Sequence, residues 1–420
     1  MLLSFKTALM PNNKQLTAFR KAAGVSRHAY NWGNAVILDL LKARETDKSL
    51  KVPSAIDLHK RLIAEVKSIY PWYYETSKNV PQKALIDLRI AWDRCFKKIS
   101  KQPRFKKKGQ HDSFYLESGT KAKPAIRNDG KRIKLPSIGG WVRLAETLPL
   151  TAVNNCVISR QADRWFISIK YEIEKPLVTD NLPSVGVDIG IKQLAVCSNG
   201  KVFNNPKAYR KMSTRLKRLQ RRVRKKVKGS QNHTKVLRKL AKLHARVANI
   251  RKDAIHKLTN YLAQNHREVK IEDLSVKAFL KNHKLAGAIA DCGMYEFRRQ
   301  LEYKTEKFGS KLTLVDRTFP SSQICSNCGK NRHKMPLKNR TYLCPECGYT
   351  EDRDLNAAKN IDRWFGGIFV PERSEMTVSS TVTACGVDKP LKSHLETTMK
   401  QEVNTNPIYV QLGRNLYGIG

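Results

Sequence analysis

The spacing of apolar residues changes along the chain and divides it into extended and helical segments. Residues 2–8 have the composition of a short strand. From Asn13 to about Ala43 the apolar residues recur at helical intervals, and two further helical blocks cover residues 56–66 and 80–99. The pattern therefore predicts a small helical bundle over residues 10–100.

Between His111 and about Lys175 the pattern changes to short alternating runs. Gly, Pro, Asn and Asp separate five such runs, at residues 113–116, 132–135, 141–144, 155–159 and 165–171. Several short strands at this spacing indicate an antiparallel barrel or sandwich, into which residues 2–8 could pair. We therefore expect residues 1–9 and 101–175 to form one β-domain that carries residues 10–100 as an insertion.

A second sheet is expected after a linker at residues 176–183. The run Ser184-Val-Gly-Val-Asp188 leads into a second apolar run that ends at the turn Asn199-Gly200. Asn-Gly between two apolar runs is a strong hairpin signal, which predicts an edge-accessible strand leading into a β-meander. Burying the Asp188 carboxylate in such a strand is costly unless it has a partner, such as a metal ion. Alternatively, Asp188 faces a turn between its flanking glycines.

Residues 206–265 form the most basic segment, and no acidic residue occurs from Lys201 to Arg251. Apolar residues repeat every three or four positions on both sides of a break at Gly229-Ser230, which predicts a helical hairpin with a thin apolar seam. A solvated helical face would normally mix charge signs, so this segment is expected to bind phosphate backbones. The candidate contacts include Arg215, Arg218, Arg221, Arg222, Lys225 and Arg238.

Two further groups of carboxylates follow. A strand at residues 268–274 contains Glu272, and Asp352 and Asp354 precede an Ala-rich helix, where a carboxylate could also be a plain N-cap. Three carboxylates on separate elements of one mixed sheet can converge at one end of that sheet. Hard oxygen ligands of this type suit Mg²⁺ or Mn²⁺. Two such ions about 4 Å apart would suit phosphodiester hydrolysis.

Four cysteines have the spacing of a metal site. Cys325 and Cys328 form one C-x-x-C pair, and Cys344 and Cys347 form a second pair fifteen residues later. Two such knuckles can hold one tetrahedral, structural Zn²⁺ that does no chemistry. A glycine directly follows each pair and suits the tight turn of a knuckle. The alternatives are two vicinal disulfides or four unrelated thiols.

The net charge limits the class of partner. The 420 residues include 80 Lys and Arg against 36 Asp and Glu, a formal charge of +44. Such a chain repels itself unless a polyanion lies beside it, and nucleic acid is the expected partner. A membrane surface is the rival, but no apolar run approaches the roughly 18 residues of a spanning helix. The basic loop 101–109 is either solvated or in contact with phosphate, through Arg104, Lys106 and Lys107.

Together these motifs resemble those of the TnpB or OrfB proteins of bacterial insertion sequences, which are compact RNA-guided DNA nucleases related to type V CRISPR effectors. The resemblance rests on Gly186-Val-Asp188-Ile-Gly190, Ile271-Glu272-Asp-Leu274, both cysteine knuckles and Asp352-Arg-Asp354-Leu-Asn-Ala-Ala-Lys-Asn-Ile361. It extends to Pro103-Arg-Phe-Lys-Lys-Lys108 and Arg132-Ile-Lys-Leu-Pro136, so it covers most of residues 1–365.

The resemblance implies an α/β multidomain fold. An RNase H-like RuvC nuclease domain would cover residues 184–320 and 350–365, with the basic hairpin 206–265 and a zinc ribbon at 321–349 inserted. A wedge β-barrel at 1–9 and 101–175 would hold a helical recognition insert at 10–100. Residues 366–420 are polar without an apolar period, which predicts a disordered tail.

The resemblance also assigns residues. The nuclease triad, with its Mg²⁺ or Mn²⁺, falls on Asp188, Glu272 and Asp354, and Asp354 is preferred to Asp352 because it stands two residues before Asn356. Lys78 and Gln82 resemble a Lys and a Gln that such proteins use on the short DNA motif beside the target. The implied partners are a guide RNA encoded by the element and double-stranded target DNA.

We therefore expect a monomeric, RNA-guided, Mg²⁺-dependent DNA endonuclease of a mobile element, in the cytoplasm of a bacterium or archaeon and associated with the nucleoid. One alternative is a non-catalytic DNA- or RNA-binding accessory protein of the transposon, such as a repressor. Another is a structure-selective resolvase that needs no guide. The three intact carboxylates favour an enzyme over the accessory protein.

Overall fold

The N-terminal sheet is antiparallel and has seven strands. The computed structural model describes residues 2–119, 124–174, 181–332, 335–336, 339–365 and 368–369, which belong to one unit, Met1–Ser374. The strand order is β2-β6-β7-β1-β5-β4-β3. β1 pairs with β7 and β5, as the pattern allows. The strands are β1 (Leu2–Met10), β2 (Ser113–Glu117), β3 (Arg127–Asn128), β4 (Arg132–Lys134), β5 (Trp141–Leu144), β6 (Asn155–Gln161) and β7 (Arg164–Glu172).

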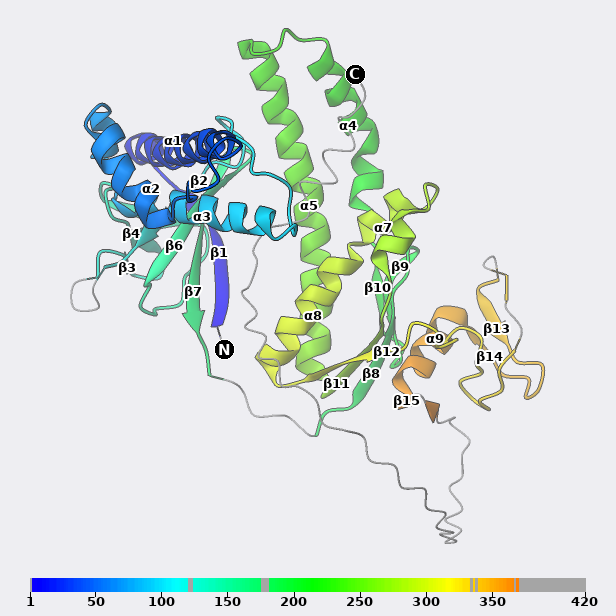
Figure 1. Cartoon of the computed structure of the whole chain (residues 1–420). Coiled ribbons are helices and arrows are strands. Elements are labelled where there is room, and N and C mark those ends of the chain that lie inside the picture. Colours follow the sequence, from blue (N-terminus) through cyan, green and yellow to red (C-terminus); the bar gives the residue numbers. More distant parts are fainter. Residues whose placement is uncertain are drawn as a thin grey trace, which may run out of the picture. The chain divides into compact units, whose positions relative to one another are not determined.

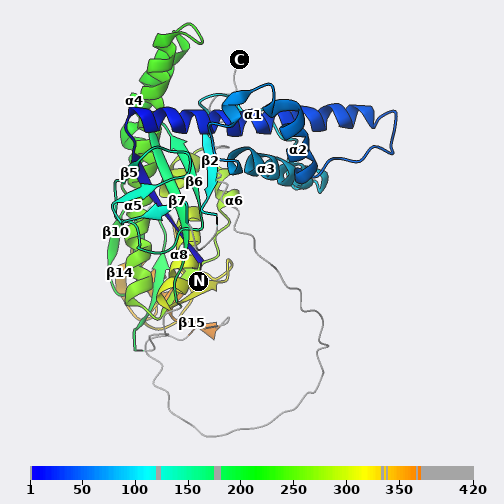
Figure 2. The ribbon, with the colours of Figure 1, turned by 90° about the vertical axis from the view of Figure 1, so that its left-hand side faces the viewer.

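The predicted helical bundle is present and lies between β1 and β2 in the chain. It consists of α1 (Asn13–Ala43), α2 (Ala55–Arg61), η1 (Leu62–Lys67), η2 (Pro71–Tyr73) and α3 (Asn79–Phe96). α1 starts at a capping box in which Asn12 and Gln15 exchange side-chain hydrogen bonds with each other's backbone. Figure 2 shows α1 along its length with α3 beside it. A Cβ at Gly33 would lie 2.7 Å from a terminal methyl group of Leu85, so α1 and α3 approach each other closely at this glycine.

The second sheet is mixed, in the order β10-β9-β8-β11-β12. β8 and β9 are antiparallel, whereas β11 pairs in parallel with both β8 and β12. The prediction of an edge-accessible strand for Asp188 is therefore wrong, because β11 covers the free edge of β8 from more than 80 residues away in the sequence. The strands are β8 (Ser184–Asp188), β9 (Gln193–Cys197), β10 (Val202–Asn204), β11 (Glu268–Glu272) and β12 (Lys311–Val315).

Helices cover both faces of this sheet (Figure 1). Val185, Val187 and Ile271 point to one face and share a core with α5 (Gln231–Asn265) and α8 (Met294–Phe308). On the other face lies α9 (Arg353–Asp362), packed so closely that a Cβ at Gly186 would be 2.2 Å from the carbonyl oxygen of Ala358. The alternation of β8 thus sends Asp188 and Gly186 to the α9 side.

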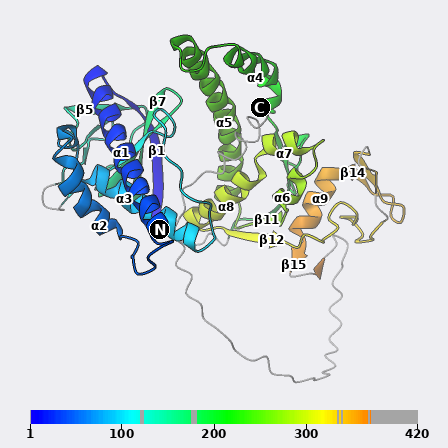
Figure 3. The same cartoon turned by 45° about the horizontal axis from the view of Figure 1, so that its top comes forward.

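The predicted basic hairpin is formed by α4 (Ala208–Arg224) and α5, which lie side by side in Figures 1 and 3. Their seam includes Leu216, Leu219, Leu240 and Leu243. Val227, which continues the apolar repeat up to the break at Gly229-Ser230, is 79% exposed and lies outside the seam, because α4 ends before it.

The remaining elements are short. The helical stretch 286–308 is divided at Gly293, whose φ is +68°, into α7 (Ala286–Cys292) and α8. The others are α6 (Val276–Leu280), β13 (Thr341–Leu343), β14 (Thr350–Asp352), β15 (Trp364–Phe365) and β16 (Ile368–Phe369). The expected linker at 176–183 and tail at 366–420 fall mostly outside the described residues. Within the described ranges, every helix is too short or too polar to cross a membrane.

Candidate functional site

The structure brings Asp188, Glu272 and Asp354 to one end of the mixed sheet. Asp188 is the last residue of β8 and Glu272 is the last residue of β11. The parallel register pairs Val187 with Ile271, so the two carboxylates stand beside each other on adjacent strands. Asp354 lies in the first turn of α9, one helical turn before Ala358, which packs on β8.

The three carboxylates interact electrostatically. Burial, together with the negative charges of Glu272 and Asp354, raises the pKa of Asp188 to about 8, and Arg353 opposes this shift. Burial also raises the pKa of Glu272, although a hydrogen bond from Ser321 acts in the opposite direction. Carboxylates that share a site raise one another's pKa in this way, and clusters of this kind occur often at functional sites.

Asp352 and Asp354 have different roles. The Asp352 side chain is the N-cap of α9 and accepts hydrogen bonds from the backbone N–H groups of Asp354 and Leu355, at 2.9 and 3.2 Å. The Asp354 side chain lies 3.6 Å from the guanidinium of Arg340 and contributes to the field at Asp188. The N-cap interpretation therefore applies to Asp352 and leaves Asp354 available to the carboxylate group.

The carboxylates are close without forming a closed cage. Among the described residues, only the four cysteines form a group of three or more candidate ligands whose atoms all lie within 4.8 Å of one another. An open carboxylate set is compatible with Mg²⁺, which keeps several waters and binds proteins through one or two carboxylates. The donor chemistry of Asp188, Glu272 and Asp354 therefore fits Mg²⁺ or Mn²⁺.

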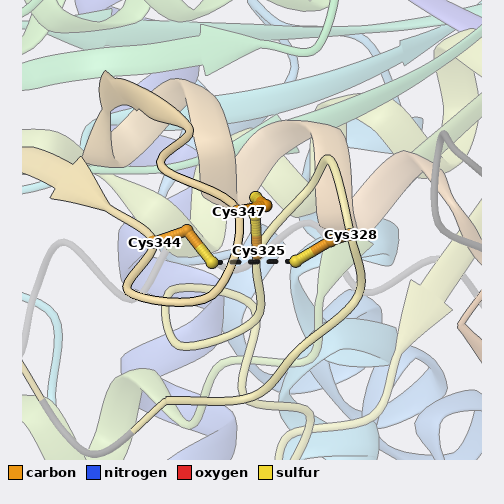
Figure 4. Close-up of side chains that lie close together, drawn as sticks. All are labelled: Cys325, Cys328, Cys344 and Cys347. Carbon is orange, nitrogen blue, oxygen red and sulfur yellow. Dashed lines mark hydrogen bonds between the residues drawn. The ribbon is translucent and has the colours of Figure 1, made fainter.

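The four cysteines converge from two knuckles (Figure 4). The sulfur atoms of Cys325 and Cys347 are 3.7 Å apart, and those of Cys328 and Cys344 are 3.6 Å apart. A tetrahedral zinc with bonds of about 2.3 Å places its sulfurs about 3.8 Å apart, so this spacing fits Zn²⁺. The described cysteines are all free thiols, which excludes the disulfide alternative.

The backbone of the knuckles supports metal binding. The glycines that follow the cysteine pairs, Gly329 and Gly348, have φ of +77° and +67°, as predicted for tight turns. A hydrogen bond from the backbone of Tyr349 is the main cause that lowers the pKa of Cys347 to about 6, whereas burial raises the pKa values of Cys325 and Cys328. Because zinc binds thiolates, this shift favours the ligand form of Cys347.

Sequence reasoning missed several residues that hold the carboxylates. Ser321 donates a 2.5 Å hydrogen bond to Glu272. Asp273 binds Arg298 and Arg317, which fixes the end of β11. The fully buried Lys270 donates to the carbonyl oxygens of Asp362 and Trp364 at the end of α9. Two sequence signals could have pointed to members of this set, because Ser321 stands in the Phe319-Pro-Ser-Ser run and Asp273 stands in the Ile271-Glu272-Asp-Leu274 motif.

The candidate DNA-motif residues lie together on one helix. α3 begins at Asn79, so Pro81 occupies its first turn and does not displace its start. Lys78 is the residue before the helix, Gln82 follows one turn later, and both are exposed. They therefore share one helical face.

The basic candidates differ in exposure. Arg215, Arg218, Arg221, Arg222, Lys225 and Arg238 are all exposed, and none forms an ion pair with the described part of the chain. Arg104 and Lys107 are also exposed. Lys106 instead packs over the ring of Tyr30 at 4.0 Å, and burial lowers its pKa. The hairpin is thus the larger open cationic surface.

Three family models match the chain. A model described as "Probable transposase" (OrfB_IS605) matches residues 168–283, and a "Cas12f1-like, TNB domain" model matches residues 295–361. A "Helix-turn-helix domain" model of the same OrfB_IS605 type matches residues 1–45. In this structure those residues form β1 and one continuous helix, α1, without an internal turn.

Relatives match over most of the chain. A "Putative RNA-guided DNA endonuclease" of Streptomyces pristinaespiralis is 40% identical over 291 residues, 68% of this chain and 71% of that protein. The "Putative RNA-guided DNA endonuclease InsQ" of Escherichia coli K12 is 33% identical over 379 residues, 86% and 91% of the two chains.

The fold is also similar to that of a solved structure. The protein in a Cas12f1-sgRNA-target DNA complex superposes with a TM-score of 0.54 at 14% sequence identity, over 83% of this chain and 82% of that one. The fold is therefore the mixed α/β, Cas12f-like type, with a RuvC region and a four-cysteine domain. The resemblance inferred from the sequence motifs is confirmed, and the chain belongs to the TnpB/OrfB family of IS605-type insertion sequences.

Proposed function

We propose that this protein is an RNA-guided, Mg²⁺-dependent DNA endonuclease of a transposable element that cuts DNA beside a short flanking motif. The observation that carries the proposal is the meeting of Asp188, Glu272 and Asp354 at one end of the mixed sheet, where burial and the two neighbouring carboxylates raise the pKa of Asp188. The description of the relatives as RNA-guided DNA endonucleases supports the same activity.

Asp188, Glu272 and Asp354 would hold one or two Mg²⁺ or Mn²⁺ ions. When bound, the ion supplies Lewis-acid stabilisation for the charge on the phosphate under attack. Ser321 would keep Glu272 oriented through its 2.5 Å hydrogen bond. Asp352 would cap α9 and so hold in place the first helical turn, which carries Asp354. The four cysteines would hold one structural Zn²⁺.

The guide RNA and the target DNA would bind the basic surfaces. The exposed arginines of α4 and α5 are suited to phosphate backbones, which fix position without reading sequence. Sequence would be read by base pairing between guide and target, and directly only at the flanking motif, through Lys78 and Gln82. We assign the seven-stranded sheet to the wedge domain and residues 10–100 to its recognition insert. We also propose that the active form is a monomer.

Cleavage of a plasmid library tests the proposal. The library carries a fixed target beside randomised flanks, and the protein is co-expressed with the RNA encoded next to its gene. Cleavage should require the RNA, Mg²⁺ and Asp188, and the cut plasmids should share one flanking motif. Asp188→Ala should abolish cleavage, whereas Asp316→Ala should retain it, because Asp316 follows the neighbouring strand β12 but is exposed and outside the carboxylate group.

Two outcomes would contradict the proposal and support a different function. RNA-dependent plasmid binding by wild type and Asp188→Ala alike, without cleavage by either, would indicate a non-catalytic accessory protein. Cleavage of branched DNA by protein freed of RNA would indicate a resolvase that needs no guide.

A further inference from the structure

The first zinc knuckle is hydrogen-bonded to a side chain of α9. Asn356 accepts a hydrogen bond from the backbone N–H of Ser326 at 2.9 Å and donates one to the carbonyl oxygen of Ile324 at 2.8 Å. These two backbone groups flank the zinc-ligand candidate Cys325. Asn356 has no exposed surface, so its amide has no water to replace either bond. These hydrogen bonds therefore fix the position of α9 relative to the backbone of the first knuckle.

Two further residues on the same face of α9 extend this contact. Asn360 donates to the carbonyl oxygens of Ser321 and Ile324, both at 2.7 Å, and Arg363 donates to the carbonyl oxygen of Ser326. Residues 356, 360 and 363 are spaced by four and three, so they form one stripe along the helix. Residues 356–363, which cover most of α9 and its C-cap residue, thus face the segment 321–326.

Ser321 joins this contact to the second carboxylate. Its carbonyl oxygen accepts from Asn360, and its hydroxyl donates to Glu272 at 2.5 Å. The segment that enters the zinc ribbon therefore contacts β11 and α9 at the same time. Asp354 lies on the same helix, two residues before Asn356.

The mixed sheet also holds α9, but only behind its first turn. Ala358 and Asp362 lie against Gly186, and the Lys270 ammonium binds the carbonyl oxygens of Asp362 and Trp364. These contacts hold the middle and the C-terminal end of the helix. The first turn, which carries Asp354, precedes them and adjoins the ribbon through Asn356 and the β13–β14 strands.

We propose that the zinc ribbon positions Asp354 and Glu272, so that occupancy of the four-cysteine site sets the affinity of the carboxylate site for Mg²⁺. Bound zinc fixes the backbone at residues 324–326, and Asn356, Asn360 and Ser321 transmit that geometry to α9 and β11. Asn356 and Asn360 are positioning residues, since neither touches the carboxylates. The effect on Mg²⁺ rests on the proposed function, whereas the mechanical link between zinc and α9 does not.

Hydrogen exchange tests the link without any need for activity. Zinc is removed from the full-length protein with a chelator, and amide protection is compared with that of the zinc-loaded protein. Amides of residues 353–362 should exchange at least about tenfold faster without zinc, as expected for a local opening. Those of α3, residues 79–96, should not change. Equal protection of α9 in the two forms would overturn the proposal.

Substitutions then test the effect on Mg²⁺. Asn356→Ala and Asn360→Ala should each raise the Mg²⁺ concentration for half-maximal cleavage about tenfold, the usual cost of removing a residue that orients a ligand. Each variant should still contain one zinc per chain and approach the wild-type rate at saturating Mg²⁺. A wild-type Mg²⁺ requirement in both folded variants would overturn the proposal.

The matched control is Asn34→Ala. Asn34 is also fully buried and accepts a 2.9 Å hydrogen bond, from Trp92, but it belongs to the helical bundle. This variant should lose thermal stability and keep its Mg²⁺ requirement. If the Asn356 or Asn360 variant does not fold, the exchange experiment on the wild-type protein decides. If the wild-type protein does not cleave DNA, the proposed function is wrong. The exchange experiment would still show whether zinc binding stabilises α9.

Discussion

At the scale of single residues, the proposed metal ligands Asp188 and Glu272 have raised pKa values, so a metal ion would have to displace protons from them. The raised pKa values of Asp188 and Glu272 mean that the metal-free native protein holds protons that the unfolded chain releases. Its free energy of unfolding should therefore fall as pH rises from the usual Asp range towards about 8. A divalent ion must displace the same protons, so its binding should show the opposite dependence.

We expect the Mg²⁺ concentration for half-maximal cleavage to fall as pH rises from about 6 to 8, and to level off above that range. The measurement is a Mg²⁺ titration of cleavage at fixed ionic strength across this range. Thermal unfolding with and without Mg²⁺ provides the companion experiment, in which Mg²⁺ should stabilise the protein more at the higher pH. A Mg²⁺ requirement independent of pH would contradict the assignment of the raised pKa to a metal ligand.

The two aspartates before α9 should respond differently to substitution. Asp352→Asn should retain cleavage, because Asn is as good an N-cap as Asp. Asp354→Asn should reduce cleavage more than about a hundredfold, which exceeds the usual cost of losing a residue that only supports a metal ligand. Single-turnover cleavage at saturating Mg²⁺ measures both. If Asp352→Asn lost most of its cleavage activity while Asp354→Asn remained active, Asp352 would be the metal ligand and Asp354 would not.

The proposed metal ligands were easier to predict from the sequence than the residues that hold them in place. Asp188, Glu272, Asp354 and the cysteines stand in short local patterns, so the sequence alone could nominate them. Ser321 and Lys270 act through contacts to residues 49 and 92 positions away, and no local pattern marks such contacts. The different roles of Asp352 and Asp354 likewise became clear only from the cap geometry of α9, because the two residues lie within one turn of each other.

At the scale of elements, local periodicity predicted the seam of the hairpin and most strands. It failed where pairing is non-local: β8 became a central strand because the distant β11 pairs with it in parallel. The break between α7 and α8 depends on a left-handed Gly293, which an unbroken apolar pattern conceals. The order of the strands in the two sheets, on which the site depends, is likewise invisible to patterns that span only a few residues.

The contact of α9 with β8 predicts a severe effect of Gly186→Ala. The new methyl group would lie 2.2 Å from the Ala358 carbonyl oxygen and 2.3 Å from the Asp362 nitrogen, so helix and strand must separate. We expect a loss of about 3 kcal/mol or more, at the upper end of the usual range for overpacking. Thermal unfolding measures it, with Gly139→Ala as the control, because nothing lies within 4 Å of a Cβ at that position.

The α4–α5 hairpin should supply RNA affinity by neutralising phosphates. Replacing Arg218 and Arg222 with Gln should weaken RNA binding and reduce the slope of log affinity against log salt by about 0.7–0.9 for each phosphate that is no longer neutralised. Filter binding at several salt concentrations measures both quantities. Lys257→Gln is the control on α5, because Lys257 is already paired with Asp253 at 2.8 Å. An unchanged slope in the double variant would show that these two arginines do not contact RNA phosphates.

At the scale of the whole molecule, a formal charge of +44 is unfavourable for a compact chain without a counter-charge. We expect the RNA-free protein to become more stable as ionic strength rises, because salt screens the repulsion. The RNA complex should unfold at a higher temperature than the free protein and should lose that advantage in high salt, because binding stabilises only the bound form. Thermal unfolding over a salt series, with and without RNA, tests both expectations.

The position of α9 in the chain affects the order in which the protein acquires its parts on the ribosome. The hairpin α4–α5 precedes α9 by about 90 residues, from Asn265 to Arg353. Because domains fold as they emerge, the nascent chain can present its basic hairpin to RNA before Asp354 has been synthesised. If the hairpin binds the guide RNA as proposed, that binding can precede completion of the carboxylate set, and a chain interrupted before residue 353 would bind RNA but lack Asp354.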